Sequence, residues 1–267
     1  MLRFFRQIRQ GSISDNKFRK YFLYVIGEII IVIVGILIAL QVDNWNTQRQ
    51  DRAEAQVFMR RLKNEFQDNR NQLLQKIEMR KRALESAREL VRIVDDPTEN
   101  ASRSQVDSLL AIALPVYTFD PSQGVLNQLT STDKLTLLRS EALNDKLSAW
   151  ASMIEDFKED ENMYNSYNHN HFRPFLYKNY NSRNIINSRI RNKVISPILL
   201  ASPESVNTEI GYSNKPVELD VLLNAVEFEN YLAFTISWLS LINTQSKGVL
   251  NYIDEVLAIL DEEIKSD

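Results

Sequence analysis

The stretch that decides the fold is YFLYVIGEIIIVIVGILIALQV, from Tyr21 to Val42, and its only charged residue is Glu28. As a helix it would be roughly 33 Å long, close to the hydrocarbon thickness of about 30 Å of a lipid bilayer. The run Ile29–Leu40 is too uniformly apolar for a buried helix of a soluble protein. We therefore predict one transmembrane helix at 21–42.

The residues on both sides of this run fit a membrane helix. Tyr21 and Tyr24 lie at one end and Trp45 lies just beyond the other, where amphipathic rings favour the headgroup region. A cleaved signal peptide is disfavoured, because the apolar run is too long and no small-x-small cleavage site follows it.

Basic residues are concentrated before the apolar run. The positive-inside rule therefore places 1–20 in the cytoplasm and 43–267 outside it, which in a Gram-negative cell is the periplasm. After the run, 43–57 contains only Arg49 and Arg52, although three more basic residues follow at 60–63. Those that precede it are Arg3, Arg6, Arg9, Lys17, Arg19 and Lys20.

The first ten residues, MLRFFRQIRQ, separate into two sides on a helical wheel. This basic stub is either a short interfacial helix on anionic lipid or a cytoplasmic flank that only sets the topology. The apolar side holds Phe4, Phe5 and Ile8, and the polar side holds Arg3, Arg6, Gln7 and Gln10.

The composition excludes several classes of function. A net charge of −3 gives no basic footprint for nucleic acid. The absence of cysteine excludes disulfides, thiolate metal sites and cysteine nucleophiles. With only six glycines and no phosphate-loop, serine-nucleophile or zinc-protease motif, we expect no catalytic residues, no cofactor and no metal.

All seven prolines follow the apolar run, and they cluster outside three long stretches. Proline costs about 3 kcal/mol inside a helix, so these stretches are the natural helices. We predict long helices at about 43–94, 141–170 and 216–264, each with one apolar seam. In the second, the seam consists of Leu143, Leu147, Trp150, Ile154, Phe157 and Tyr164.

Long helices with a single apolar stripe need partners. The simplest arrangement lays the last helix antiparallel to the one that follows the membrane, as in a coiled coil, with the middle helices packed at the far end. Two irregular regions, 95–124 and about 171–216, lie between the long helices. Tyr231–Ile242 is too short for a second membrane pass. We predict an all-α class: one N-terminal transmembrane helix continuing into a long-helix extracytoplasmic bundle.

Two segments carry a family resemblance. They are YVIGE (24–28) with GILIALQVDNWN (35–46), and YTFDP (117–121) with the residues that follow it to Leu138. This pattern resembles an uncharacterised family of single-pass inner-membrane proteins common in Bacteroidota, except that Asp43 stands where Asn is expected. The resemblance implies a bacterial inner-membrane protein with a helical extracytoplasmic domain and no established activity.

Four residues of the apolar run are candidates for helix packing in the membrane. Gly35 and Ala39 form a small-xxx-small pair, and Gly27 extends a similar face. Glu28 is costly in lipid unless it snorkels, pairs or is protonated. It could serve a helix-to-helix contact, snorkel without a role, or act as a proton-responsive group; similarly, the glycine pair could be a chance feature of an apolar run.

The seam of the helix at 141–170 turns polar at its end. Its continuation past Phe157 is Glu161, Tyr164, Asn168 and His171, which could line a pocket for a small polar ligand. Imidazole and carboxylate also suit transition metals, but His169 and His171 do not share a helical face and no third ligand is fixed. We favour the simpler interpretation that a helix end enters solvent here.

These observations favour a membrane-anchored helical interaction or scaffold protein over an enzyme. Its expected partners are the lipid bilayer and a second copy or another membrane protein. One alternative is a sensor-like periplasmic ligand-binding bundle, which would signal through a partner because the cytoplasmic stub is short. Another is a proton-responsive subunit of a membrane complex that uses Glu28.

Overall fold

The computed structural model describes residues 15–96, 101–191, 210–215 and 218–265. Within those ranges every regular element is a helix and no strand occurs, which confirms the predicted all-α class for the described residues. The basic stub, residues 1–10, lies outside the described ranges. The chain divides into two units after Val57, and helix α2 (Asp15–Asp95) contributes residues to both.

The first unit contains the apolar run, as part of α2. None of the apolar window is buried, and this is the one described helix that is long and apolar enough to cross a membrane. Ile31, for example, is 73% exposed. The apolar segment of α2 is therefore a candidate membrane span.

The second unit is built on three long helices: the later part of α2, α5 (Glu141–Tyr167) and α9 (Val226–Lys265). Two ion pairs, Lys63–Asp261 and Arg70–Asp254, join α2 to α9, each at 2.6 Å. The residue that comes later in α2 pairs with the residue that comes earlier in α9. These two helices are therefore antiparallel.

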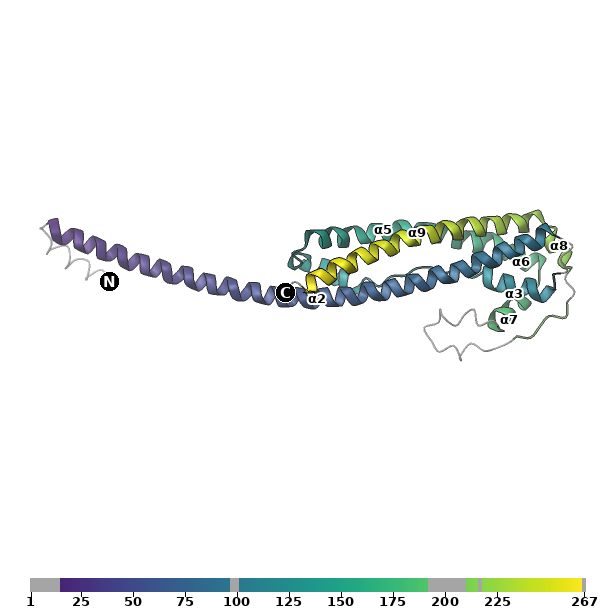
Figure 1. The fold of residues 1–267 in the computed structure, drawn as a ribbon, viewed down its shortest axis with the longest axis horizontal. Helices are drawn as coiled ribbons and strands as arrows, with labels where there is room; N and C mark the ends of the chain where they lie inside the picture. The colour runs from purple at the N-terminus through teal and green to yellow at the C-terminus, as the bar shows by residue number, and fades with distance from the viewer. Residues whose placement is uncertain (1–14, 97–100, 192–209, 216–217, 266–267) are drawn as a thin grey trace. The chain divides into compact units, whose positions relative to one another are not determined.

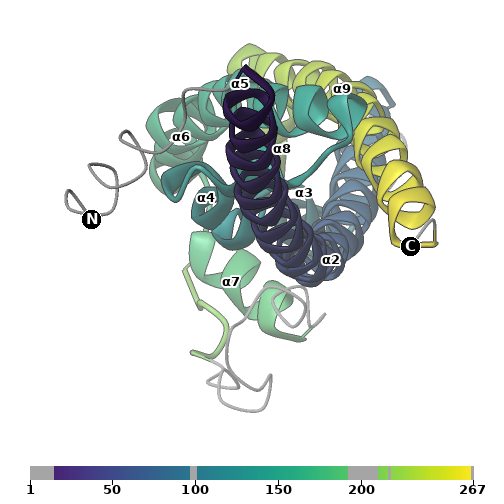
Figure 2. The ribbon, with the colours of Figure 1, turned by 90° about the vertical axis from the view of Figure 1, so that its left-hand side faces the viewer.

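Helix α5 also packs along α9, and Figures 1 and 2 show the two side by side. Lys146 pairs with Glu255, and Gln245 donates to Asp160, so α9 is antiparallel to α5 as well. The expectation that the middle helices pack at the far end was therefore wrong for α5. Its apolar seam extends over the whole helix, so burying it requires contact over the whole length.

One part of the interior lies where α2, α5 and α9 meet. Phe66, Trp150 and Tyr252 contribute one ring from each helix, with centroids 5.0 Å and 6.1 Å apart in succession. Phe66 and Trp150 are fully buried and Tyr252 is half-buried. Full burial of a large apolar side chain contributes about 1.5–3 kcal/mol. These aromatic contacts hold the three helices together.

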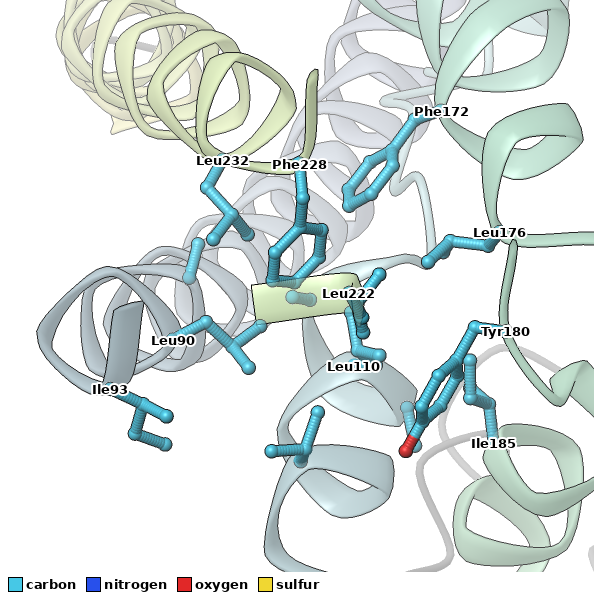
Figure 3. Close-up of a cluster of buried hydrophobic side chains, with 14 residues drawn as sticks. Leu90, Ile93, Leu110, Phe172, Leu176, Tyr180, Ile185, Leu222, Phe228 and Leu232 are labelled. Atoms are coloured by element: carbon cyan, nitrogen blue, oxygen red, sulfur yellow. The ribbon is translucent and has the colours of Figure 1, made fainter. Parts of the chain in front are cut away.

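A second cluster of buried side chains joins the shorter helices (Figure 3). It combines the end of α2 and the start of α9 with α3 (Arg103–Ala113), α6 (Arg173–Asn179), α7 (Ser182–Arg191) and α8 (Leu219–Leu223). The regions 95–124 and 171–216, predicted to be irregular, therefore contain α3, α6 and α7. Helix α3 begins at a side-chain cap, because the Ser102 hydroxyl accepts the Gln105 N–H at 3.2 Å.

The predicted helix at 216–264 is divided, and that prediction is corrected. Helix α8 ends at Leu223, and α9 begins at Val226. Between them, the ψ of 0° at Asn224 lies outside the helical region. The Asn224 side chain donates to the Asp220 carbonyl at 2.8 Å, which supports the break. Leu222 and Phe228, on either side of it, are both fully buried in the cluster of Figure 3.

The helix predicted at 141–170 also differs at its end. After Tyr167 the chain forms a π-helical turn, η2 (Asn168–Phe172), and continues as α6. Pro174 lies in the first turn of α6, where the missing N–H is tolerated. This proline therefore does not end the helical path, contrary to the prediction.

Candidate functional site

The row of polar residues predicted on α5 turns inward, with one exception. Glu161, Tyr164 and Asn168 are all buried, whereas His171 and His169 are exposed. The π turn carries the buried stripe from Asn168 to Phe172, so His171 faces outward and packs against the ring of Tyr167 instead. The structure thus buries three of the four residues on one helical face. The favoured interpretation, a helix end that enters solvent, was therefore wrong for Glu161, Tyr164 and Asn168, whereas His171 is exposed.

An arginine from α2 joins this row. Arg80, 1% exposed, lies 3.3 Å from the Glu161 carboxylate and donates to the Ser246 hydroxyl at 3.1 Å. The two charges and the hydroxyl link α2, α5 and α9. Burial lowers the pKa of Arg80 and raises the pKa of Glu161 to about 7, and the opposite charge of each partner counteracts both shifts.

Glu161 also holds the extended chain between α3 and α4 (Gly124–Ser131). Both of its carboxylate oxygens accept the backbone N–H of Phe119, at 2.9 and 3.2 Å. Phe119 is fully buried, and its ring lies edge-on to Phe157. The buried carboxylate thereby satisfies a buried backbone donor, which would otherwise be costly.

Three side chains of α2 hold the same segment from another side. Gln72 exchanges two hydrogen bonds with the backbone of Asp120, and Asn69 exchanges two with that of Ser122. Glu65 accepts the Val125 N–H at 2.8 Å, at the start of α4. These three residues were not predicted from the sequence. Their only signal is the spacing of the polar positions 65, 69 and 72, which places them on one helical face beside the apolar seam.

The polar row ends at Arg173. Its Nε donates to the Asn168 side chain at 2.7 Å, and its Nη2 donates to the Leu114 carbonyl at 3.3 Å. The Tyr164 hydroxyl is buried without a well-formed hydrogen bond in the described part of the chain, although Thr235 and Asn168 lie beside it, and burial raises its pKa to about 12. Arg80, Glu161, Tyr164, Asn168 and Arg173 are called the buried polar row below.

A pocket with a volume of about 70 Å³ opens beyond the end of this row. We call it the arginine pocket, because Arg173 and Arg189 both line it. The Arg189 Nε and the Ser182 hydroxyl are buried and have no hydrogen-bond partner among the described residues. Its remaining lining residues are Ala111, Leu114, Pro115, Leu176, Tyr177, Ile185 and Ile186.

The predicted membrane-packing residues lie in the first unit. Glu28 and Ala39 are exposed, and a side-chain carbon added at Gly27 or Gly35 would meet nothing within 4 Å. These positions therefore have room for the close approach of another helix. Elsewhere in the described ranges, no group of three or more His, Asp or Glu is arranged to hold a metal ion.

A sequence model of one protein family matches residues 28–208, which is more than half of the chain. The chain belongs to DUF6090, a family of unknown function. The DUF6090 match includes most of the candidate span, the extended segment around Phe119 and the buried polar row of α2, α5 and α6. The expectation of an uncharacterised family is thereby confirmed. No curated protein and no solved structure matches the chain.

Proposed function

We propose that this DUF6090 protein is a membrane-anchored interaction protein without catalytic activity, whose helical second unit binds a second copy or another membrane protein. It spans a bacterial inner membrane once, with 1–20 in the cytoplasm and the helical unit in the periplasm. The supporting observation is the unburied apolar segment of α2. An exposed apolar surface of that extent is stable in lipid, not in water.

Self-association is supported by the open positions along the span. There is room for a second helix backbone at Gly27, Gly35 and Ala39. A second helix could also offer Glu28 a hydrogen-bond partner, which the lipid chains cannot. Without a partner, Glu28 would have to snorkel to the headgroups or lose its charge.

Light scattering during size-exclusion chromatography of the full chain in detergent tests this proposal. We expect a dimer or larger oligomer, and a shift to monomer for Gly35→Leu combined with Ala39→Leu. Ile33→Leu with Leu37→Ile, on the opposite face, serves as the matched control and should leave the oligomer unchanged. Glu28→Gln should lower the oligomer yield if the carboxylate lies in the contact. A monomeric wild-type chain would contradict self-association.

Orientation can be tested separately, because the chain has no cysteine. Single variants Ser12→Cys and Thr47→Cys flank the span, and a membrane-impermeant maleimide added to spheroplasts reaches only the outer face. We expect labelling of Thr47→Cys alone, and labelling of both after detergent is added. Labelling of Ser12→Cys alone would reverse the proposed topology.

A second candidate function, a ligand-binding helical domain that signals through a partner, is favoured by the arginine pocket. The pocket combines charged and apolar lining in one concave site, as small-molecule sites do. A ligand there would contact α6, which continues directly from α5 through the π turn.

A further inference from the structure

We infer that the arginine pocket binds a small organic anion, a carboxylate with a short apolar chain. This inference rests on the second candidate function, and it is independent of the membrane anchor and of self-association. Three properties of the pocket support it: its charge, its unpaired donors and its apolar walls.

The charge of the pocket is positive and uncompensated. Arg173 and Arg189 both line it, and no carboxylate pairs with either of them among the residues that the structure describes. Helix α7, which carries Arg189, contains three arginines and no acidic residue. Burial lowers the pKa of Arg189; Tyr117 counteracts this shift and the charge of Arg173 adds to it. A bound anion would stabilise the charged form of Arg189.

Residues that line the pocket carry one guanidinium group in a fixed orientation and two donor atoms without partners. Arg173 is held in place by its bonds to Asn168 and the Leu114 carbonyl, so its orientation is fixed before a ligand arrives. The Arg189 Nε and the Ser182 hydroxyl lack partners in the described ranges, and a buried donor without an acceptor is costly. The planar guanidinium group matches the two oxygens of a carboxylate.

The apolar walls separate an organic carboxylate from an inorganic anion. Leu176 of α6 and Ile185 of α7 also belong to the buried cluster of Figure 3, so the pocket adjoins the core. Leu114, Pro115 and Ile186 extend this surface. With phosphate or sulfate bound, this apolar surface would stay exposed to water, whereas a short alkyl chain would cover it.

Calorimetry on the full chain in lipid nanodiscs tests the inference with butyrate and hexanoate as probes. Butyramide, which has nearly the same shape as butyrate but no charge, and inorganic phosphate, which has charge but no apolar chain, are the matched comparisons. We expect a carboxylate to bind at least about tenfold more tightly than butyramide, because its hydrogen bonds to arginine are charge-assisted. It should also bind at least about tenfold more tightly than phosphate, because its alkyl chain covers the apolar walls. Absence of carboxylate binding would overturn the inference, as would equal binding of butyramide or tighter binding of phosphate.

Substitutions then assign the site. Arg189→Gln should weaken butyrate binding at least about tenfold, while Arg191→Gln, on the same helix but outside the pocket lining, should not change it. Because no ion pair of Arg189 occurs in the described ranges, Arg189→Gln should keep the wild-type melting temperature. If it unfolds the chain, Ser182→Ala provides the test and should weaken binding severalfold. Full binding by the folded pocket variant would overturn the inference.

The oligomeric state separates this result from the interaction proposal. Light scattering on the same samples should give wild-type values for the pocket variants. Loss of binding with an intact oligomer supports the pocket alone. A monomeric wild-type chain that still binds butyrate would contradict self-association and leave the pocket established.

Discussion

The two parts of helix α2 differ in how far their side chains are exposed. Between 21 and 42 the apolar side chains are exposed, whereas between 58 and 93 Leu62 and Leu73 are fully buried and even the charged Arg80 is only 1% exposed. Helix formation is common to both segments, so it cannot explain the difference. The contrast marks the first segment as a candidate membrane span and the second as a segment that packs against other helices.

The largest effect should come from reversing the chemistry of the first segment. Ile33→Lys combined with Leu37→Lys should release the chain from membranes, because each lysine costs about 2.5–3.5 kcal/mol at the centre of a span. Carbonate extraction measures the released fraction. The matched control places lysine at Met163 and Leu241, which are exposed in the second unit, and should leave fractionation unchanged. If the double variant stays in the membrane fraction, the proposed difference between the two parts of α2 would be wrong.

In the second unit, truncation of a buried ring should lower the free energy of unfolding. Phe119→Ala should cost about 3–5 kcal/mol, since its ring is fully buried against Phe157. Urea unfolding of the chain in detergent measures the free energy. The exposed Met163→Ala should change it by less than about 0.5 kcal/mol, and a similarly small value for Phe119→Ala would contradict the packing described here.

The buried ion pair provides a test of polar packing. Glu161→Ala should cost about 3 kcal/mol at pH 7.5, because it leaves the Arg80 charge unpaired and the Phe119 N–H without its acceptor. Arg80→Met combined with Glu161→Leu should regain part of that loss, since an apolar pair removes the stranded charge. If the single and double variants are equally unstable, the stranded charge is not the cause.

Glu161 should also make stability depend on pH. Its pKa in the folded chain, about 7, lies above its ordinary value of 4.5, so the folded state holds the proton more tightly. Its contribution is therefore complete below pH 4.5 and is lost as the pH rises to about 7, by at most about 3 kcal/mol. Wild type should lose stability relative to Glu161→Gln over this interval in urea titrations, whereas parallel curves would contradict the raised pKa.

The smallest expected effect concerns two glycines in different backbone states. Gly211 has a φ of +71°, and an added side-chain carbon would lie 3.2 Å from the Arg183 guanidinium. Gly211→Ala should cost about 1 kcal/mol. Gly248→Ala, within α9 and without a neighbour inside 4 Å, should be neutral or stabilising by up to about 1 kcal/mol. Equal effects in thermal melts would show that backbone strain at Gly211 is absent.

The contrast between the two parts of α2 was predictable from the sequence. The periodicity of apolar residues indicates which face of a helix is buried. An unbroken apolar run and a single seam, such as Leu143 to Phe157, therefore predict different surroundings. The same reasoning predicted that Glu161, Tyr164, Asn168 and His171 share one face, which holds for the first three but not for His171. Proline positions were a weaker guide, since Pro174 lies inside a first turn and the break near Asn224 needs no proline.

The polar contacts of the second unit could not be predicted in the same way. Glu65, Asn69 and Gln72 read as solvated residues of a long helix until the segment around Phe119 is placed against them. The short helices α3 and α7 depend on the tertiary cluster of Figure 3 for their stability, because isolated helices of that length are marginal. The arginine pocket is lined by residues of α3, α6 and α7, so no single stretch of the sequence predicts it.

Cysteine labelling along α2 tests the central contrast most directly. Because the chain has no cysteine, single variants can be placed at Ile31, Ile33 and Leu37 in the span and at the exposed Leu74 in the second unit. In intact nanodiscs, a water-soluble maleimide should label only Leu74→Cys, and unfolding in detergent should make all four reactive. Equal labelling of the span positions before detergent is added would show that this segment lies in water, and the proposed anchor would be wrong.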